Sequence, residues 1–176
     1  MSFPPVLARN DVNLNSRLKD IYVSEIVPLI CAQGDDGNYG SAATRDIEAL
    51  QLISRRIHFG KFVAEAKFMD PKEHDLYVEL IRKRDKEGIW DLLTFKAVEE
   101  RLLERVKRKA AIYGQDLMAA EAAASTSPTT KNAVLENLKI PLQVVSDIYE
   151  KIIIPLTKDV EVDYLLQRLE SGEGHI

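Results

Sequence analysis

Apolar residues recur at spacings of three and four along most of this sequence, and that periodicity limits the chain to helical folds. A strand turns alternate residues to opposite faces, so a half-buried sheet would need apolar residues at every second position. Such alternation is nowhere sustained, whereas helical spacing returns in segment after segment. The pattern predicts an all-α fold, a multi-helix bundle of about five or six helices. The expected helices cover residues 15–32, 42–68, 71–86, 94–114 and 141–170.

The bulk properties predict a single helical domain over residues 1–176, because this length is enough for one compact core. A net charge of −4 gives no electrostatic reason to bind nucleic acid or an anionic membrane. Cys31 is the only cysteine, which excludes an intrachain disulfide and a CxxC metal site. No signal peptide is recognisable, and no apolar run approaches the ~18 residues of a membrane span. We therefore expect a cytoplasmic protein.

Three segments have the composition of connections rather than helices. The glycine-rich stretch over residues 34–41 predicts a loop, and Ser41 is the expected N-cap of the following helix. Residues 119–132 are small and rich in Ser, Thr and Pro, which predicts a mobile loop. Residues 171–176 are expected to form a disordered tail.

Two prolines and one glycine interrupt the predicted helices. Pro28 and Pro155 are expected to kink their helices, because a proline lacks the N–H of the helical hydrogen bond. Gly88 is expected to break the helix over residues 71–86 and to begin a short turn that leads to Thr94.

The helix over residues 42–68 carries two cations on its apolar stripe. At about 100° per residue, Arg56 and Lys67 align with Ala49, Leu52, Ile53, Phe59, Gly60 and Val63. The opposite side is expected to be solvated and contains Gln51, Arg55, His58 and Glu65. A buried cation without a partner is destabilising, so each of the two cations needs an anion or a route to water.

Two explanations of Arg56 and Lys67 are open on spacing alone. The cations either form internal salt bridges and reach the helix edge, or they line opposite walls of an anion pocket. Glu161 and Glu99 show the same irregularity, one on an apolar stripe and the other at the edge of one. Together these residues predict either a charge-compensated core or a polar binding site in a helical bundle, and periodicity does not decide between the two.

Three long segments, in order, resemble one known family. They are GSAATRDIEALQLISRRIHFGKFVAEAKF at residues 40–68, VEERLLERVKRKAAIYG, and YEKIIIPLTKDVEVDYLLQRLE. These segments resemble the all-helical chorismate mutases of fungi and plants, and the likeness extends over about residues 3–170. The resemblance implies the rearrangement of chorismate to prephenate, a step towards phenylalanine and tyrosine. That pericyclic reaction needs no metal or cofactor, and a protein accelerates it by restraint and by charge at the breaking ether bond.

The resemblance implies roles for five residues of this sequence. Arg56 should bind a substrate carboxylate, and Lys67 should donate a hydrogen bond to the ether oxygen. Glu161 should hold a proton, because burial raises its pKa, and should donate to the same oxygen. Thr157 should contact a carboxylate, and Glu99 should accept from the substrate hydroxyl. Mildly acidic pH should therefore favour activity.

A regulatory site and a partner subunit are also implied by the resemblance. Asn38, Gly40, Ser41 and Thr44 match one side of the family's site for a tyrosine or tryptophan effector. The family is typically dimeric, so we expect a homodimer.

The sequence departs from the fungal members at its N-terminal end. Those members have a further long stretch that supplies one more arginine to the substrate pocket and others to the regulatory site. We therefore expect an N-terminally shortened mutase with weakened activity. One alternative is a catalytically silent mutase-like module that pairs with a full-length mutase. Another is a general helical adaptor, in which Arg56 and Lys67 are paired with carboxylates in a closed core.

Overall fold

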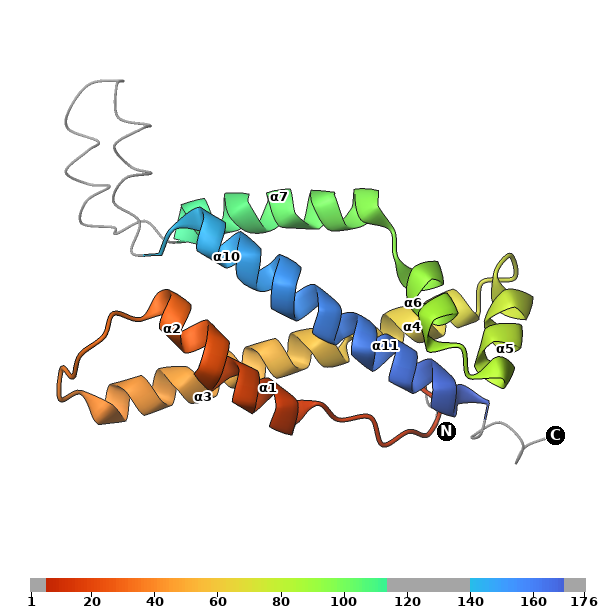
Figure 1. Ribbon diagram of the computed structural model, residues 1–176, viewed down its shortest axis with the longest axis horizontal. Coiled ribbons are helices and arrows are strands. Elements are labelled where there is room, and N and C mark those ends of the chain that lie inside the picture. The colour runs from red at the N-terminus through yellow and green to blue at the C-terminus, as the bar shows by residue number, and fades with distance from the viewer. Residues whose placement is uncertain (1–5, 114–139, 170–176) are drawn as a thin grey trace, which may run out of the picture.

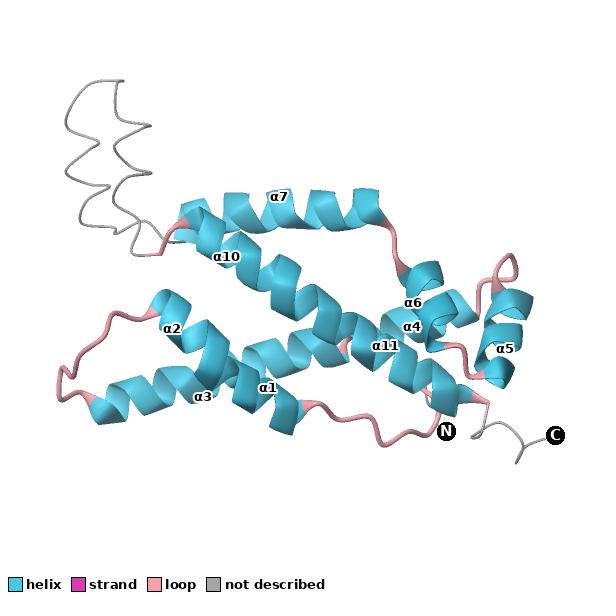
Figure 2. Cartoon of the chain, viewed as in Figure 1, coloured by secondary structure: helices cyan, strands magenta, loops and turns pink. Residues whose placement is uncertain are grey.

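The computed structural model describes residues 6–113 and 140–169, which form helices joined by short connections (Figures 1 and 2). No strand occurs in these two ranges, which confirms the predicted all-α class. The expected mobile loop over residues 119–132 and the expected tail over 171–176 lie outside the described residues. No described helix is long and apolar enough to cross a membrane.

A central helix crosses the molecule diagonally, and the other helices pack around it (Figure 1). This central helix consists of α10 (Leu142–Ile148), the π-helical turn η3 (Tyr149–Ile153) and α11 (Ile154–Arg168). The helices that precede it are α1 (Asn15–Ile21), the π-helical turn η1 (Tyr22–Ile26), α2 (Val27–Ile30), α3 (Tyr39–His58), α4 (Gly60–Phe68), α5 (His74–Lys83), α6 (Lys86–Leu93) and α7 (Lys96–Tyr113).

Each proline that was expected to kink a helix follows a π-helical turn. One residue, Val27, separates the end of η1 from Pro28. In the same way, Ile154 separates the end of η3 from Pro155. Proline has no N–H, and its ring would clash with the carbonyl group one turn earlier. The wider turn before each proline accommodates the ring, so both helices continue past the proline.

The helix predicted over residues 42–68 differs from the structure at its start and near its middle. Asn38, not Ser41, occupies the N-cap position, so α3 begins earlier than predicted. At Phe59 the chain makes a hydrogen-bonded turn that separates α3 from α4. The two cationic residues Arg56 and Lys67 therefore lie on different helical segments.

Two further predictions, around α5 and α6, are wrong. The chain turns through Asp70, whose carbonyl oxygen accepts from the N–H of His74, and α5 begins only there. Gly88 does not break a helix but lies in the first turn of α6, where its N–H donates to the Asp85 carboxylate at 2.9 Å. A side-chain N-cap of this kind starts a helix, and its stabilisation outweighs the low helix propensity of glycine.

The side of α4 that faces α11 also differs from the prediction. Glu65 was expected to be solvated, but it is 9% exposed, whereas Leu52 on the predicted buried stripe is 64% exposed. Three donors explain the burial of this carboxylate. The Tyr164 hydroxyl donates at 2.5 Å, and Arg168 donates from Nε at 2.8 Å and from Nη2 at 3.1 Å.

Two apolar cores share the central helix. Ile153 and Leu156 belong to the core formed with α1, η1 and α3, whereas Val160 and Leu165 belong to the core formed with α4, α5 and α6. Between these cores, α11 places the polar residues of the candidate site.

Candidate active site

A pocket of about 250 Å³ lies among α3, α4, α7 and α11. Its lining contains all five residues for which the sequence predicted a role, Arg56, Lys67, Glu99, Thr157 and Glu161. The remaining lining residues are Val63, Leu93, Phe95, Val98, Ile154 and Lys158. The pocket therefore combines an apolar surface with a few charged groups, as is typical of small-molecule sites.

The pocket argues against a closed core in which the two cations are neutralised by carboxylates. Within the described residues, neither Arg56 nor Lys67 forms an ion pair. The Lys67 ammonium instead donates to the carbonyl oxygen of Leu93 at 2.9 Å and lies 4.6 Å from the centre of the Phe95 ring. Its positive charge is therefore available to an anion in the pocket.

Burial lowers the pKa of Lys67, and the nearby Glu161 partly opposes that shift. The largest cause is desolvation, which disfavours the charged ammonium. An anionic ligand would compensate the charge and favour the protonated lysine.

Glu161 is the most strongly perturbed carboxyl group of the pocket. It is 6% exposed, and burial raises its pKa to about 7. Lys67, Lys158 and Arg56 lower that pKa, but desolvation has the larger effect. Below about pH 7 the carboxyl group therefore keeps its proton and can donate a hydrogen bond.

Lys158 is a third cation of the pocket that the sequence reasoning missed. Its Nζ lies 2.6 Å from Glu99 Oε1 and donates to Thr94 Oγ1 at 2.8 Å. The ammonium also lies 5.3 Å from the centre of the Trp90 ring. A sequence signal existed, because Lys158 is one helical turn before Glu161 and so lies on nearly the same face of α11.

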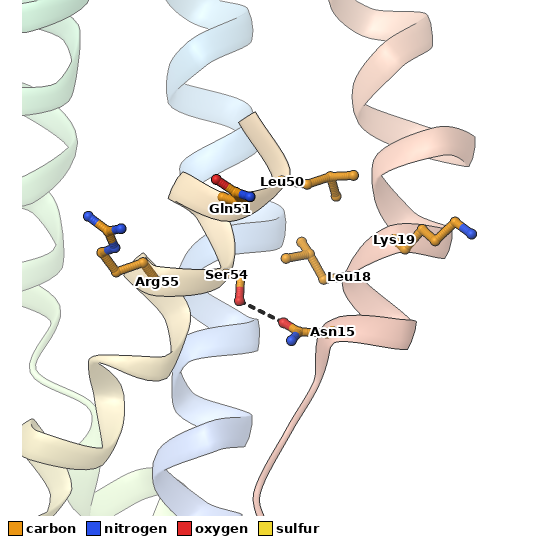
Figure 3. Close-up of a pocket in the computed structure, with 7 residues that line it drawn as sticks. All are labelled: Asn15, Leu18, Lys19, Leu50, Gln51, Ser54 and Arg55. Atoms are coloured by element: carbon orange, nitrogen blue, oxygen red, sulfur yellow. Dashed lines mark hydrogen bonds between the residues drawn. The ribbon is translucent and has the colours of Figure 1, made fainter. Parts of the chain in front are cut away.

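A second and larger pocket of about 430 Å³ lies between α1 and α3 (Figure 3). Its floor includes a hydrogen bond of 2.6 Å from Ser54 Oγ to Asn15 Oδ1. In Figure 3 the charged ends of Lys19 and Arg55 point in opposite directions, away from this hydrogen bond. No charged groups converge there, so we place the candidate site in the smaller pocket despite its size.

The residues predicted to bind an effector lie together at the N-terminal end of α3. Asn38 is at the N-cap position, and Gly40, Ser41 and Thr44 follow in the first turns, all of them exposed. The Thr44 hydroxyl donates to the Gly40 carbonyl oxygen at 2.9 Å. The helix geometry places this group about 20 Å along α3 from Arg56.

A model of the family "Chorismate mutase type II" matches residues 38–162. The chain belongs to this family. The match confirms the resemblance found in the sequence, and it includes the five predicted pocket residues.

Three relatives support the same assignment. The chorismate mutase of Saccharomyces cerevisiae is 47% identical over 175 residues, which cover 97% of this chain and 62% of the relative. The solved structure of the chorismate mutase Aro7p from Candida albicans, in complex with L-Trp, is 44% identical in sequence and has a TM-score of 0.78. That match covers 97% of this chain and 60% of the Candida albicans chain. The structure of AtCM1 with tyrosine bound in an allosteric site is 38% identical, with a TM-score of 0.78 over 96% of this chain and 63% of that chain. The chain thus spans about three fifths of the length of these relatives.

Proposed function

We propose that this chain rearranges chorismate to prephenate in the pocket among α3, α4, α7 and α11. The observation that carries the proposal is the combination of three cations and one protonatable, buried carboxyl group in a single pocket. Chorismate carries two carboxylates, one hydroxyl and an ether oxygen, so this set of side chains matches its charges and its hydrogen-bonding groups.

The reaction breaks the ether C–O bond and forms a C–C bond within one molecule, without adding or removing atoms. Negative charge develops on the ether oxygen in the transition state, where Lys67 and protonated Glu161 donate hydrogen bonds to it. The hydrogen bond to the Leu93 carbonyl oxygen orients Lys67 before the reaction, and burial against Gly60 confines Glu161, so little reorganisation is needed in the transition state. The walls of the pocket hold the substrate in the compact conformation from which the bond forms.

Three further side chains hold the substrate. Arg56 binds one carboxylate, where a guanidinium group can donate two parallel hydrogen bonds. Thr157 contacts a carboxylate from the neighbouring wall. Glu99 accepts from the substrate hydroxyl, and its ion pair with Lys158 fixes its position.

Loss of chorismate absorbance, measured at about pH 5.5 and 7.5, tests the proposal on the purified chain. We expect turnover that falls by roughly a hundredfold or more in Lys67→Ala and in Arg56→Ala. Arg55→Ala is the matched control for Arg56→Ala, because Arg55 is the adjacent, exposed arginine that lies outside this pocket. A folded chain with no turnover at either pH would contradict the proposal and would favour a silent mutase-like module.

We also propose that an aromatic amino acid binds at Asn38, Gly40, Ser41 and Thr44. The support is the L-Trp bound to the Candida albicans structure and the tyrosine bound in the allosteric site of AtCM1. Isothermal titration with tyrosine and tryptophan tests it, with Thr44→Val as the variant that should weaken binding.

We also propose that the chain forms a homodimer and acts in the cytoplasm. Three large apolar side chains of the pocket lining are exposed, Val63, Phe95 and Val98. Leu52, Phe59 and Phe62, on α3, α4 and the turn between them, are exposed as well. A second subunit that covered them would remove their apolar surface from water. Analytical ultracentrifugation measures the oligomeric state directly.

A further inference from the structure

Gly60, the first residue of α4, lies directly against α11. A Cβ atom on this residue would lie 2.9 Å from the carbonyl oxygen of Thr157, 3.0 Å from Glu161 Cγ and 3.1 Å from Thr157 Cγ2. Carbon atoms in contact prefer separations of about 3.5–4.0 Å, so both carbon contacts would be too short. The contact of 2.9 Å with the carbonyl oxygen is also closer than a Cβ atom normally comes. Glycine has a low helix propensity, so propensity does not explain its place in the first turn of α4. The close packing against α11 does explain it.

The atoms that a methyl group at position 60 would meet differ in how easily they can move. The Thr157 hydroxyl donates to the Ile153 carbonyl oxygen at 2.6 Å, which holds Cγ2 of Thr157 against Gly60. The Thr157 carbonyl oxygen belongs to the backbone of the central helix. The Glu161 side chain has neither constraint, because it forms no hydrogen bond or ion pair within the described residues. Added volume at residue 60 would therefore displace the Glu161 side chain and, because the contact with the Thr157 carbonyl oxygen is shorter still, push α4 away from α11.

We propose that Gly60 is a positioning residue that lets α4 and α11 approach closely enough to hold Glu161 between the cations of the pocket. Gly60 follows the turn at Phe59 directly, so it lies between Arg56 at the end of α3 and Lys67, which is about two turns further along α4. It thus joins the wall that carries these cations to the wall that carries Thr157 and Glu161. The consequence for catalysis rests on the function proposed above, whereas the geometric claim does not.

Several charged or titratable groups face the Glu161 carboxyl group. They are Arg56 from α3, Lys67 from α4, Glu99 from α7, Lys158 from α11 and Tyr77 from α5. Burial has the largest effect on the pKa of Glu161 and keeps it high. Separating α4 from α11 would admit water to this carboxyl group, so its pKa should fall towards the ordinary value of a glutamate.

The test substitutes alanine for Gly60 and titrates the Glu161 carboxyl group by carbon-13 NMR, with Glu161→Gln to assign the signal. We expect the pKa of Glu161 to fall by roughly one pH unit in Gly60→Ala. We also expect kcat to fall by roughly tenfold to a hundredfold, with a smaller change in KM. Ala66→Gly is the matched control, because it weakens the helix propensity of α4 on its exposed side and leaves the contact with α11 unchanged.

The NMR titration also separates this proposal from the proposed function. If the wild-type chain does not turn over chorismate, the function fails, and the titration still measures how far burial raises the pKa of Glu161. A folded Gly60→Ala chain with the wild-type pKa at Glu161 would overturn the role of Gly60. If Gly60→Ala does not fold, the double variant Gly60→Ala/Thr157→Ser removes the Cγ2 contact and keeps the hydroxyl, and the same criterion applies to it.

Discussion

Lys158 on α11 and Glu99 on α7 form an ion pair at the edge of the candidate site, with Nζ 2.6 Å from Oε1. The lysine side chain is 10% exposed and the glutamate side chain 29% exposed, so water screens the pair only in part. The same ammonium donates to Thr94 Oγ1 at 2.8 Å. The pair thus fixes the orientation of Glu99 before any ligand enters.

The first prediction concerns this ion pair. Lys158→Met should lower the free energy of unfolding by about 1–3 kcal/mol, because it leaves the Glu99 carboxylate without its charged donor. Urea denaturation of Lys158→Met, Glu99→Gln and the double variant measures the coupling between the two residues. Arg45→Met is the control, because the exposed pair of Arg45 with Glu48 should contribute less than about 1 kcal/mol. A coupling below about 1 kcal/mol, the range of exposed pairs, would contradict the prediction.

The second prediction concerns the pH dependence of activity. With the pKa of Glu161 at about 7, the protonated donor predominates below that pH and is lost above it. The kcat/KM of the wild-type chain, which reports the free enzyme, should therefore fall as the pH rises through about 7. Glu161→Gln keeps an N–H donor at every pH, so its profile should be flat over that range. An equal alkaline fall in the glutamine variant would exclude Glu161 as the source.

The third prediction concerns stability and needs no substrate. The pKa of Glu161 rises from 4.5 to about 7 on folding, so between these values the folded state binds a proton that the unfolded state has lost. This contribution is fully present below about pH 4.5 and disappears as the pH rises through about 7. Glu161→Gln lacks it. The difference in unfolding free energy, variant minus wild type, should therefore increase by about 3 kcal/mol across this window.

Urea denaturation at about pH 4.5 and 8 measures that difference. Glu150→Gln, an exposed glutamate on the same central helix, serves as the control and should give nearly the same difference at both pH values. A Glu161→Gln difference that does not change with pH would show that the carboxyl group is not desolvated in the folded chain.

Helical periodicity predicted the charged residues of the site, because the pocket is lined by the same stripes of α3, α4 and α11 that carry the anomalous charges. Arg56, Lys67 and Glu161 were recognisable as polar residues among apolar neighbours. The signal for Lys158 was weaker: it lies one helical turn before Glu161, but a lysine beside Thr157 resembles an ordinary solvated residue until its contact with Glu99 is seen. That contact joins two helices far apart in the sequence.

Helical periodicity gave wrong predictions of burial and of helix ends where contacts between distant residues, or a side-chain cap, determine the structure. Glu65 looked solvated, since its donors Tyr164 and Arg168 lie about a hundred residues away in the chain. Gly88 looked like a helix breaker, but the side chain of Asp85 caps a new helix at that point. The assignment of roles to the pocket residues came from the family resemblance, because spacing alone left a salt-bridged core and a binding site equally open.

The last prediction contrasts two buried tyrosines. The Tyr77 hydroxyl is fully buried and has no hydrogen-bond partner within the described chain, whereas the Tyr22 hydroxyl donates to Asp46 Oδ1 at 2.7 Å. A buried polar group without a partner destabilises the folded state, so Tyr77→Phe should raise the free energy of unfolding by about 1 kcal/mol. Tyr22→Phe should lower it by about 1–2 kcal/mol, because the carboxylate of Asp46 loses its donor. Both variants remove one oxygen atom from a buried ring, so urea denaturation isolates the hydrogen bond. A loss of stability in both would mean that the Tyr77 hydroxyl is hydrogen-bonded in solution.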